Sequence, residues 1–328
     1  MTRKGVVLLL LRTSIAAVLI VWLIRAEKID FSILFGGRFR WGWALCGFFI
    51  YSLMSLLGAY RWKWLLAAQE IEIPFWSLFR LTYIGYFFNI SMPGATGGDL
   101  AKAYYVAHLA PAKKTEAVTS VFFDRVVGLS ALAALAFVAV SIYWCVSSRS
   151  ETVRTLFLCI ASAVVILLLF TLFLSRHRGD SRFLKWCRVH LPFGKILGRA
   201  YDSLLLYRSR KLPLVMALLL SFLAHIVAVC ANYFFALALD VQPVSFLVFL
   251  FLIPVGIFLD SIPISIAGLG WGEAAYGLLF PVADYKLTLG TSVAAVMHCS
   301  KIIWGLAGSV FYLFGRKSFF ASDKADKN

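Results

Sequence analysis

A small set of ionisable side chains interrupts long apolar stretches of the chain, and it forms the candidate substrate-binding set. Its members are Asp99, Lys102, Asp124, Arg125, Asp260, Glu273 and Lys301. Acids and bases nearly balance, which suits a ligand with a phosphate and a cationic or hydroxylated group; alternatively, the side chains satisfy one another in structural ion pairs. Arg125 is the strongest candidate phosphate ligand, because its planar guanidinium can bind two phosphate oxygens. Asp124 and Arg125 are adjacent and point in different directions, so one is expected to pair with a hairpin charge while the other reaches the interface, unless they form only a structural ion pair.

Two distant stretches repeat the same order of residue types around some of these charges. FFNISMPGATGGDLAKAYY spans 87–105, and FLDSIPISIAGLGWGEAAYGLLF spans 258–280. Each has a polar residue, a proline, glycines and then an acid directly after a glycine. The prolines and glycines to which we assign structural roles are Pro93, Gly94, Gly97, Gly98, Pro263, Gly268, Gly270 and Gly272. Proline ends a helix and glycine permits tight turns, so each stretch predicts a helix, a break and a returning helix.

The acid of each stretch, Asp99 or Glu273, is expected in the first turn of the returning helix. Unpaired N–H groups and the helix dipole favour negative charge there, so a simple helix cap is one interpretation. The other is a functional site, because ionisable side chains in membrane segments are costly and usually face a functional interior. Neither glycine-rich run is a nucleotide motif: GATGGDLAK lacks the Gly-Lys-Ser/Thr of a P-loop, and GLGWGE lacks the strand context of a dinucleotide fingerprint.

Lys301 lies in the last apolar segment and needs a partner, for which Asp260 or Glu273 is the natural choice. His298 precedes it on the same helical face and is expected to be a hydrogen-bonded core residue. The sequence contains no recognisable cluster of nucleophile, base and orienting group, and the scattered cysteines lack metal-ligand spacing. We therefore expect no enzymatic activity, cofactor or metal.

Composition indicates a membrane protein. Of the 328 residues, 61% are hydrophobic and 15% are charged, and the mean hydropathy is +0.85. Runs such as 5–24 and 212–239 reach the ~20 residues needed to cross a bilayer, and 5–24 is predicted to be a retained anchor because it lacks a convincing cleavage site. The net charge is +16. We attribute it to basic residues that set the orientation of the protein in the membrane and contact anionic lipids, rather than to nucleic-acid binding.

Apolar segments are predicted at 5–24, 41–60, 74–91, 116–146, 153–175, 212–239, 243–262 and 287–314, with shorter ones at 97–108 and 268–281. If every long segment crossed the membrane, the most basic segment, 176–211, would lie outside, against the positive-inside tendency. The conflict disappears if 74–108 and 243–283 each return to the side from which they enter. We therefore predict an all-α polytopic membrane protein with about six full transmembrane helices and two oppositely oriented re-entrant helical hairpins, forming an inverted repeat around an interior cavity.

The predicted organisation is a single integral membrane domain at 1–315 followed by a short cytoplasmic tail at 316–328. Both termini and the 176–211 segment then lie on the cytoplasmic side, and a bacterial inner membrane is the expected location. Because 176–211 mixes basic with apolar residues, it is typical of a broken interfacial helix, and anionic membrane lipids are its expected partners.

The motifs NISMPGATGGDLAKAYYV, FFDRVVGL and PISIAGLGWGEAAYGLLF occur in this order. They resemble the lysylphosphatidylglycerol synthase transmembrane region family, also described as flippase-like integral membrane proteins. The resemblance implies movement of lipids or lipid-linked molecules between leaflets, and roles for Asp99, Arg125 and Glu273. Lys102 stands where an Arg is common, and Asp124 where a Glu is common. Members that make aminoacyl lipids carry a soluble catalytic domain after the membrane part; the chain ends soon after the last span, so synthesis of lysyl-lipid is not expected.

Three hypotheses about function follow. The first is a translocator that moves a phospholipid or glycolipid between leaflets through a charged cavity. The second is a membrane-embedded transferase acting on a lipid headgroup or a polyprenyl-linked sugar, which would need a donor site. The third is a non-transporting scaffold for lipid-modifying enzymes, in which the buried charges are only structural. The sequence does not identify a coupling ion or an oligomeric state.

Overall fold

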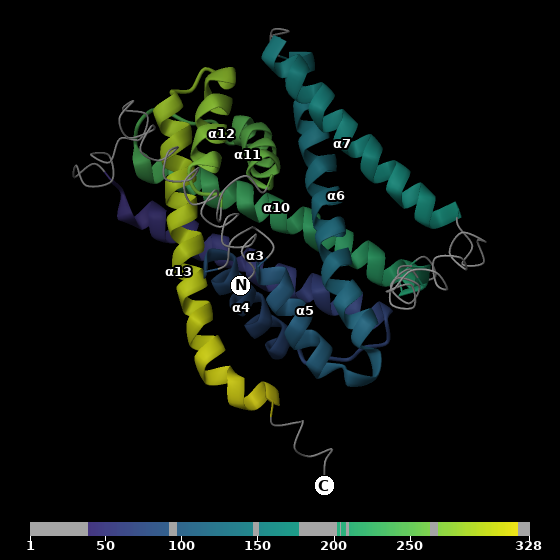
Figure 1. Cartoon of the computed structure of the whole chain (residues 1–328). Helices are drawn as coiled ribbons and strands as arrows, with labels where there is room; N and C mark the ends of the chain where they lie inside the picture. Colours follow the sequence, from purple (N-terminus) through teal and green to yellow (C-terminus); the bar gives the residue numbers. More distant parts are fainter. Residues whose placement is uncertain are drawn as a thin grey trace, which may run out of the picture.

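The computed structural model describes residues 39–91, 97–146, 151–176, 202–203, 205–207, 210–262 and 268–320 (Figure 1). Within these ranges the regular secondary structure is helical, with no strands. The predicted anchor at 5–24 lies outside the described residues, as do Pro93, Gly94, Pro263 and most of the 176–211 segment.

Four helices of the described ranges are long and apolar enough to cross a membrane. They are α3 (Trp41–Ala68), α6 (Lys114–Val146), α10 (Lys211–Leu239) and α13 (Leu287–Phe320). A fifth helix, α7 (Glu151–Arg176), has a shorter apolar stretch. The prediction of an all-α polytopic membrane protein is confirmed, whereas the number of spans stays a prediction. Two helices are longer than the predicted apolar segments, because α3 extends past 41–60 to Ala68 and α13 extends past 287–314 to Phe320.

Pairs of shorter helices occupy the two proline- and glycine-containing stretches. They are α4 (Phe75–Ser91) with α5 (Gly97–Leu109), and α11 (Phe246–Asp260) with α12 (Trp271–Leu279). The helices of each pair contact each other. Short 3-10 turns, η1 (Pro111–Lys113) and η2 (Phe280–Ala283), lead into α6 and extend α12. Two helices in each stretch are therefore confirmed, while their re-entrant path through a membrane stays a prediction.

The long helices flank the two helix pairs. In Figure 1, α13 stands on the left and α6 with α7 on the right, and α10 runs across the molecule between them. α10 contacts α3, α6, α11 and α13, and α13 also contacts α4 and α12. Residues far apart in sequence are thereby brought to the centre of the molecule, between α4–α5 and α11–α12.

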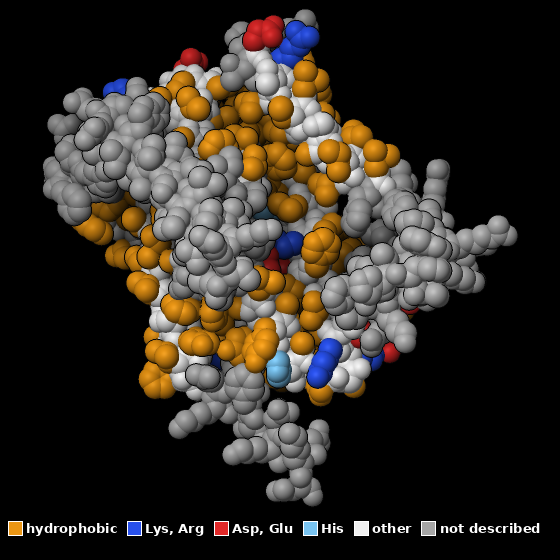
Figure 2. Space-filling view, in the orientation of Figure 1, with side chains coloured by type: hydrophobic (Ala, Val, Ile, Leu, Met, Phe, Trp, Pro, Cys, Tyr) orange, Lys and Arg blue, Asp and Glu red, His pale blue; other side chains and the backbone are white. Residues whose placement is uncertain are grey.

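Small residues allow α3 and α10 to pack closely. The buried residues of α10 include Ala217, Ser221, Ala224, Ala228 and Ala231, which recur at helical spacing. Between membrane helices there is little hydrophobic driving force, so close packing of small residues holds such helices together. The outer surface is apolar instead: Figure 2 shows hydrophobic side chains over much of the visible face, and Trp76, Leu247 and Phe314 are 64%, 76% and 81% exposed.

Gly308 determines how closely α13 approaches α4. A methyl group on Gly308 would meet the backbone carbonyl oxygen of Tyr83, which cannot move aside as a flexible side chain can. We expect Gly308→Ala to destabilise the protein by about 1–3 kcal/mol, as overpacking usually does. Thermal unfolding in detergent, followed by tryptophan fluorescence, measures the effect.

Gly42→Ala is the matched control for this prediction. Gly42 is exposed in the first turn of α3, and a methyl group there would meet nothing within 4 Å. The control is expected to leave the unfolding temperature unchanged or raise it slightly, because alanine favours a helix more than glycine does. Equal unfolding temperatures for the two variants would mean that the α4–α13 contact is looser than described.

Candidate functional site

Two adjoining cavities lie between the helix pairs. The first, of about 260 Å³, is lined by residues of α3, α4, α5, α6, α10 and α11. The second, of about 250 Å³, shares Tyr86, Asn89, Arg125, Ile257 and Ser261 with the first. In the same orientation as Figure 1, Figure 2 shows a central hollow in which basic and acidic side chains are surrounded by hydrophobic ones. The charged centre of the molecule is thus accessible from outside.

Most of the predicted site residues line these cavities. Asp99, Lys102, Asp124 and Arg125 line the first, and Arg125, Asp260 and Lys301 line the second. Glu273 lines neither cavity and is only 4% exposed. The structure therefore brings six of the seven side chains together around one space and places the seventh behind it.

Arg125 pairs with Asp99 across α6 and α5. Its Nε donates to Asp99 Oδ2 at 2.6 Å, and the two side chains are 46% and 26% exposed. Arg125 is therefore the residue that pairs with a hairpin charge, whereas Asp124, 8% exposed, is buried rather than extended toward the interface. Asp99 lies in the first turn of α5, as predicted. Because this pair is partly exposed to the cavity, a ligand can reach both side chains.

Asp124 pairs with Arg61, a residue that the sequence analysis assigned to no site. Arg61 Nε and Nη2 donate to the two carboxylate oxygens of Asp124 at 2.6 and 2.9 Å, and Nη1 donates to Ser221 Oγ at 3.2 Å. One guanidinium therefore joins α3, α6 and α10. The signal was present in the sequence, since the apolar and aromatic run of α3 continues past Arg61 through Trp62 to Ala68, so the arginine lies within a helix rather than in a loop.

Lys102 contributes a positive charge to the first cavity. Its Nζ lies 5.4 Å from the centroid of the Trp62 ring, which is a cation–π contact. Among the residues that the structure describes, no carboxylate lies within ion-pair distance of Lys102. The charged residues lining this cavity are the cations Arg61, Lys102 and Arg125 and the acids Asp99 and Asp124. Cations thus exceed acids, which favours an anionic ligand.

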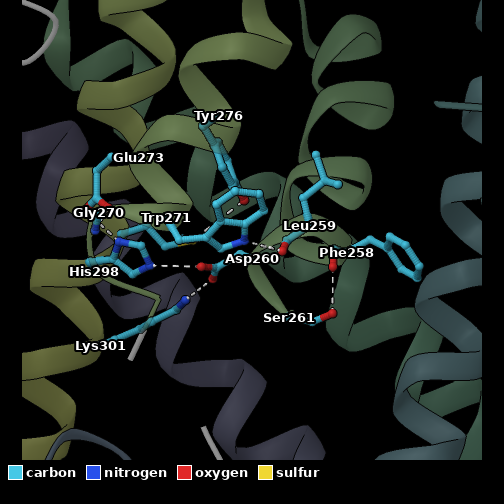
Figure 3. A network of polar contacts seen from close by, with 11 residues as sticks. Phe258, Leu259, Asp260, Ser261, Gly270, Trp271, Glu273, Tyr276, His298 and Lys301 are labelled. Atoms are coloured by element: carbon cyan, nitrogen blue, oxygen red, sulfur yellow. Dashed lines mark hydrogen bonds and ion pairs between the residues drawn. The ribbon is translucent and has the colours of Figure 1, made fainter. Parts of the chain in front are cut away.

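The second helix pair holds a polar network that includes Asp260, Glu273 and His298 (Figure 3). Lys301 Nζ donates to Asp260 Oδ2 at 2.7 Å, so the predicted partner of Lys301 is Asp260 rather than Glu273. His298 Nδ1 lies 2.8 Å from Glu273 Oε1, and Nε2 lies 3.5 Å from Asp260 Oδ1. His298 is 1% exposed, and the prediction of a hydrogen-bonded core histidine is confirmed.

Glu273 also caps its own helix. Its Oε2 accepts a hydrogen bond from the Gly270 backbone N–H at 2.7 Å, so the helix-cap interpretation holds for this acid. Gly268 and Gly270 have φ values of +81° and +78°, a left-handed conformation that favours glycine. A methyl group on Gly272 would meet the His298 ring and the Asp260 carboxylate, so the polar network and the helix start are packed against each other.

The polar residue before the proline is an amide, Asn89, in the first helix pair and an acid, Asp260, in the second. Asn89 Oδ1 accepts a hydrogen bond from the Gly98 backbone N–H at 2.7 Å, at the start of α5. A methyl group on Gly98 would meet the carbonyl oxygen of Gly85, so α4 and α5 approach closely at this point. The neutral Asn89 needs no counter-charge, whereas Asp260 has Lys301. The two pairs therefore share a layout and differ in charge.

Comparison with known proteins identifies the family. A family model described as "Lysylphosphatidylglycerol synthase TM region" matches residues 8–308. No curated protein and no solved structure matches the chain significantly. The family description refers to the membrane part of an enzyme of phospholipid synthesis, which indicates an integral membrane protein of lipid metabolism or transport. Because the match covers most of the chain, this protein belongs to the lysylphosphatidylglycerol synthase transmembrane region family.

Proposed function

We propose that this protein moves a phosphate-bearing amphiphile, a phospholipid or glycolipid, between membrane leaflets. The headgroup binds in the two adjoining cavities while the acyl chains stay in the surrounding lipid. The observation that supports this most directly is Lys102, a cation that lines the cavity with no carboxylate at ion-pair distance among the described residues. A phosphate is the natural partner for such a cation, because binding it neutralises the excess positive charge.

The exposed Arg125–Asp99 pair supplies the second ligand for the headgroup. A guanidinium can bind phosphate oxygens in place of a carboxylate. The Arg125–Asp99 pair is also the most exposed of the three ion pairs that line the cavities. The displaced Asp99 carboxylate is then free to accept a hydrogen bond from a hydroxyl or amine of the headgroup. Because Arg125 exchanges Asp99 for the phosphate, the phosphate charge is paired with a guanidinium inside the apolar membrane region, and the headgroup hydroxyl or amine solvates the released carboxylate.

The proposal includes the path through the membrane. The pairs α4–α5 and α11–α12 enter from opposite sides as re-entrant hairpins, as in transporters built from inverted repeats, in which the substrate binds between the repeats. The basic segment 176–211 lies on the cytoplasmic side of a bacterial inner membrane and attracts anionic lipids to the entrance. Both termini are cytoplasmic in this arrangement.

Lipid retention tests the headgroup site. We expect detergent-purified protein to retain a discrete phosphate-bearing lipid, and Lys102→Gln to retain it at a level lower by about tenfold, since a hydrogen bond to a charged group contributes about 1.5–3 kcal/mol. Mass spectrometry of extracted lipid measures this. Lys113→Gln is the control, because Lys113 lies outside the cavities and contacts Glu70 and the backbone of Gln69.

Reconstitution tests translocation itself. Vesicles carrying a fluorescent phosphatidylglycerol in the inner leaflet are exposed to an impermeant quencher, and protein is expected to accelerate the loss of protected fluorescence. A chemically altered lipid in the vesicles would instead support the membrane-embedded transferase. Identical bulk lipids on the wild type and Lys102→Gln, together with no acceleration, would overturn the proposal in favour of a scaffold.

A further inference from the structure

His298 lies between two buried carboxylates that come from different helices. Figure 3 shows its ring from α13 with Glu273 of α12 on one side and Asp260, at the end of α11, on the other. The side chains of His298, Glu273 and Asp260 are 2%, 6% and 8% exposed. Because the ring is held between two acids and away from bulk solvent, adding or removing one proton changes the electrostatic energy of the cluster strongly.

The hydrogen bonds around His298 leave its Nε2 able to accept one proton. A neutral imidazole has a single N–H, and the 2.8 Å contact between Nδ1 and Glu273 Oε1 uses it. Nε2 is then an acceptor that faces another acceptor, Asp260 Oδ1, at 3.5 Å. Both atoms are buried and have no hydrogen-bond partner among the described residues. A proton on Nε2 would let the ring donate to both carboxylates at once and would satisfy both atoms.

The charge balance favours the same proton. Asp260 and Glu273 carry two negative charges against the one positive charge of Lys301, so the cluster is left with one negative charge when His298 is neutral. The other titratable groups near the cluster are Tyr51 of α3, Tyr276 of α12 and Cys299 of α13, all neutral near pH 7. The Gly270 N–H at the start of α12 offsets part of the Glu273 charge. Burial of the remaining charge in an apolar region is unfavourable, and one bound proton removes it.

Lys301 connects this cluster to the cavity. Its Nζ is bound to Asp260, yet 32% of the side chain is exposed, and both residues line the second cavity together with Arg125. An anionic headgroup in that cavity competes with Asp260 for the ammonium group. Once Lys301 turns toward the headgroup, Asp260 loses its counter-charge, and a proton on His298 Nε2 becomes the replacement donor.

We propose that Glu273, His298 and Asp260 form a proton-binding site that is linked through Lys301 to the anionic headgroup in the cavity. This inference rests on the proposed function, because the headgroup is the ligand that releases Asp260. One proton enters from the cavity and forms a bond to His298 Nε2; no other bond is made or broken. Linkage is reciprocal, so the bound proton strengthens headgroup binding and the headgroup strengthens proton binding. A proton gradient can then drive the lipid in one direction.

Calorimetry of the full-length protein in detergent tests the linkage. The probe is dihexanoylphosphatidylglycerol, whose phosphodiester does not titrate near neutral pH, and the heat is compared in buffers of different ionisation enthalpy. We expect uptake of about one proton for each lipid bound, and an affinity that rises by up to about tenfold for each unit decrease in pH where the site titrates. His298→Gln should bind the lipid with no proton uptake. His108→Gln, at an exposed histidine near the end of α5, is the control and should behave like the wild type.

Nitrogen NMR of histidine-labelled protein gives a second readout that does not depend on lipid. The His298 signals, identified by their absence in His298→Gln, are expected to change from one protonated ring nitrogen to two as the pH is lowered from about 8 to about 5. Lipid binding without proton uptake would overturn the linkage and leave the proposed function standing. Absence of lipid binding would overturn the headgroup site and its linkage. A His298 ring that keeps a single proton from about pH 8 to about pH 5 would overturn the proton site itself.

Discussion

Arg61→Met is expected to destabilise the protein by about 3–5 kcal/mol, as breaking a buried ion pair usually does. Arg61 and Asp124 are 16% and 11% exposed and share two hydrogen bonds. Without Arg61, the Asp124 carboxylate stays inside the molecule with no guanidinium to neutralise it, and the hydrogen bonds by which one side chain links α3, α6 and α10 are lost. The free energy of unfolding in mixed micelles, measured by denaturant titration, gives the effect.

A second substitution and a control separate this effect from lost packing. Arg61→Met/Asp124→Leu removes both charges and is expected to recover much of the stability, because no unpaired charge remains. Arg40→Met removes Arg40 from Asp240, an ion pair whose side chains are 58% and 44% exposed, and should lose at most about 1 kcal/mol. If Arg40→Met and Arg61→Met lost the same stability, the Arg61–Asp124 pair would not be buried as the structure describes.

Arg125→Gln is expected to lower the rate of lipid transfer by about tenfold to a hundredfold. In the proposed site, the substitution removes a charge-assisted contact to the headgroup, and such a contact contributes about 1.5–3 kcal/mol. Arg125→Lys should recover only part of the rate, because an ammonium group cannot bind two phosphate oxygens in a fixed planar geometry. The vesicle assay with fluorescent phosphatidylglycerol measures each variant.

The controls for Arg125 address folding and surface charge. Asp99→Asn/Arg125→Gln leaves no unpaired acid, so a loss of rate in this double variant cannot come from the exposed Asp99 charge. Arg154→Gln removes a surface arginine that is 61% exposed and pairs only loosely with Glu151, at 3.5 Å, and it should keep the wild-type rate. A wild-type rate in Arg125→Gln would exclude this guanidinium from the headgroup site.

The order and extent of most helices could be predicted from the sequence, because hydropathy, proline and glycine act locally. The predicted segments 116–146 and 212–239 agree closely with α6 and α10. The two broken stretches were recognised for the same reason, since proline stops a helix through its own missing N–H. The predicted segment 41–60 stops before the charged residue Arg61, whereas α3 continues to Ala68 because the apolar and aromatic run resumes after it.

The charged residues of the site were also largely visible in the sequence, because a charge in an apolar run stands out whatever its surroundings. The sequence by itself therefore determined the fold class, the family and six of the side chains that line the cavities. It also narrowed the partner of Lys301 to two acids. These conclusions depend only on residue type and on neighbours along the chain.

Tertiary structure alone decided which charges neutralise one another. Lys301 pairs with Asp260 and Arg61 with Asp124 across 41 and 63 residues of sequence, and Glu273 turns to His298. Electrostatic pairing in a buried site depends on distances of a few ångströms, which the packing of α3, α6, α11, α12 and α13 determines. The same packing leaves Lys102 beside Trp62 rather than beside an acid. Residue type determined that the centre is charged, and the packing of the helices determined which charges face the cavity.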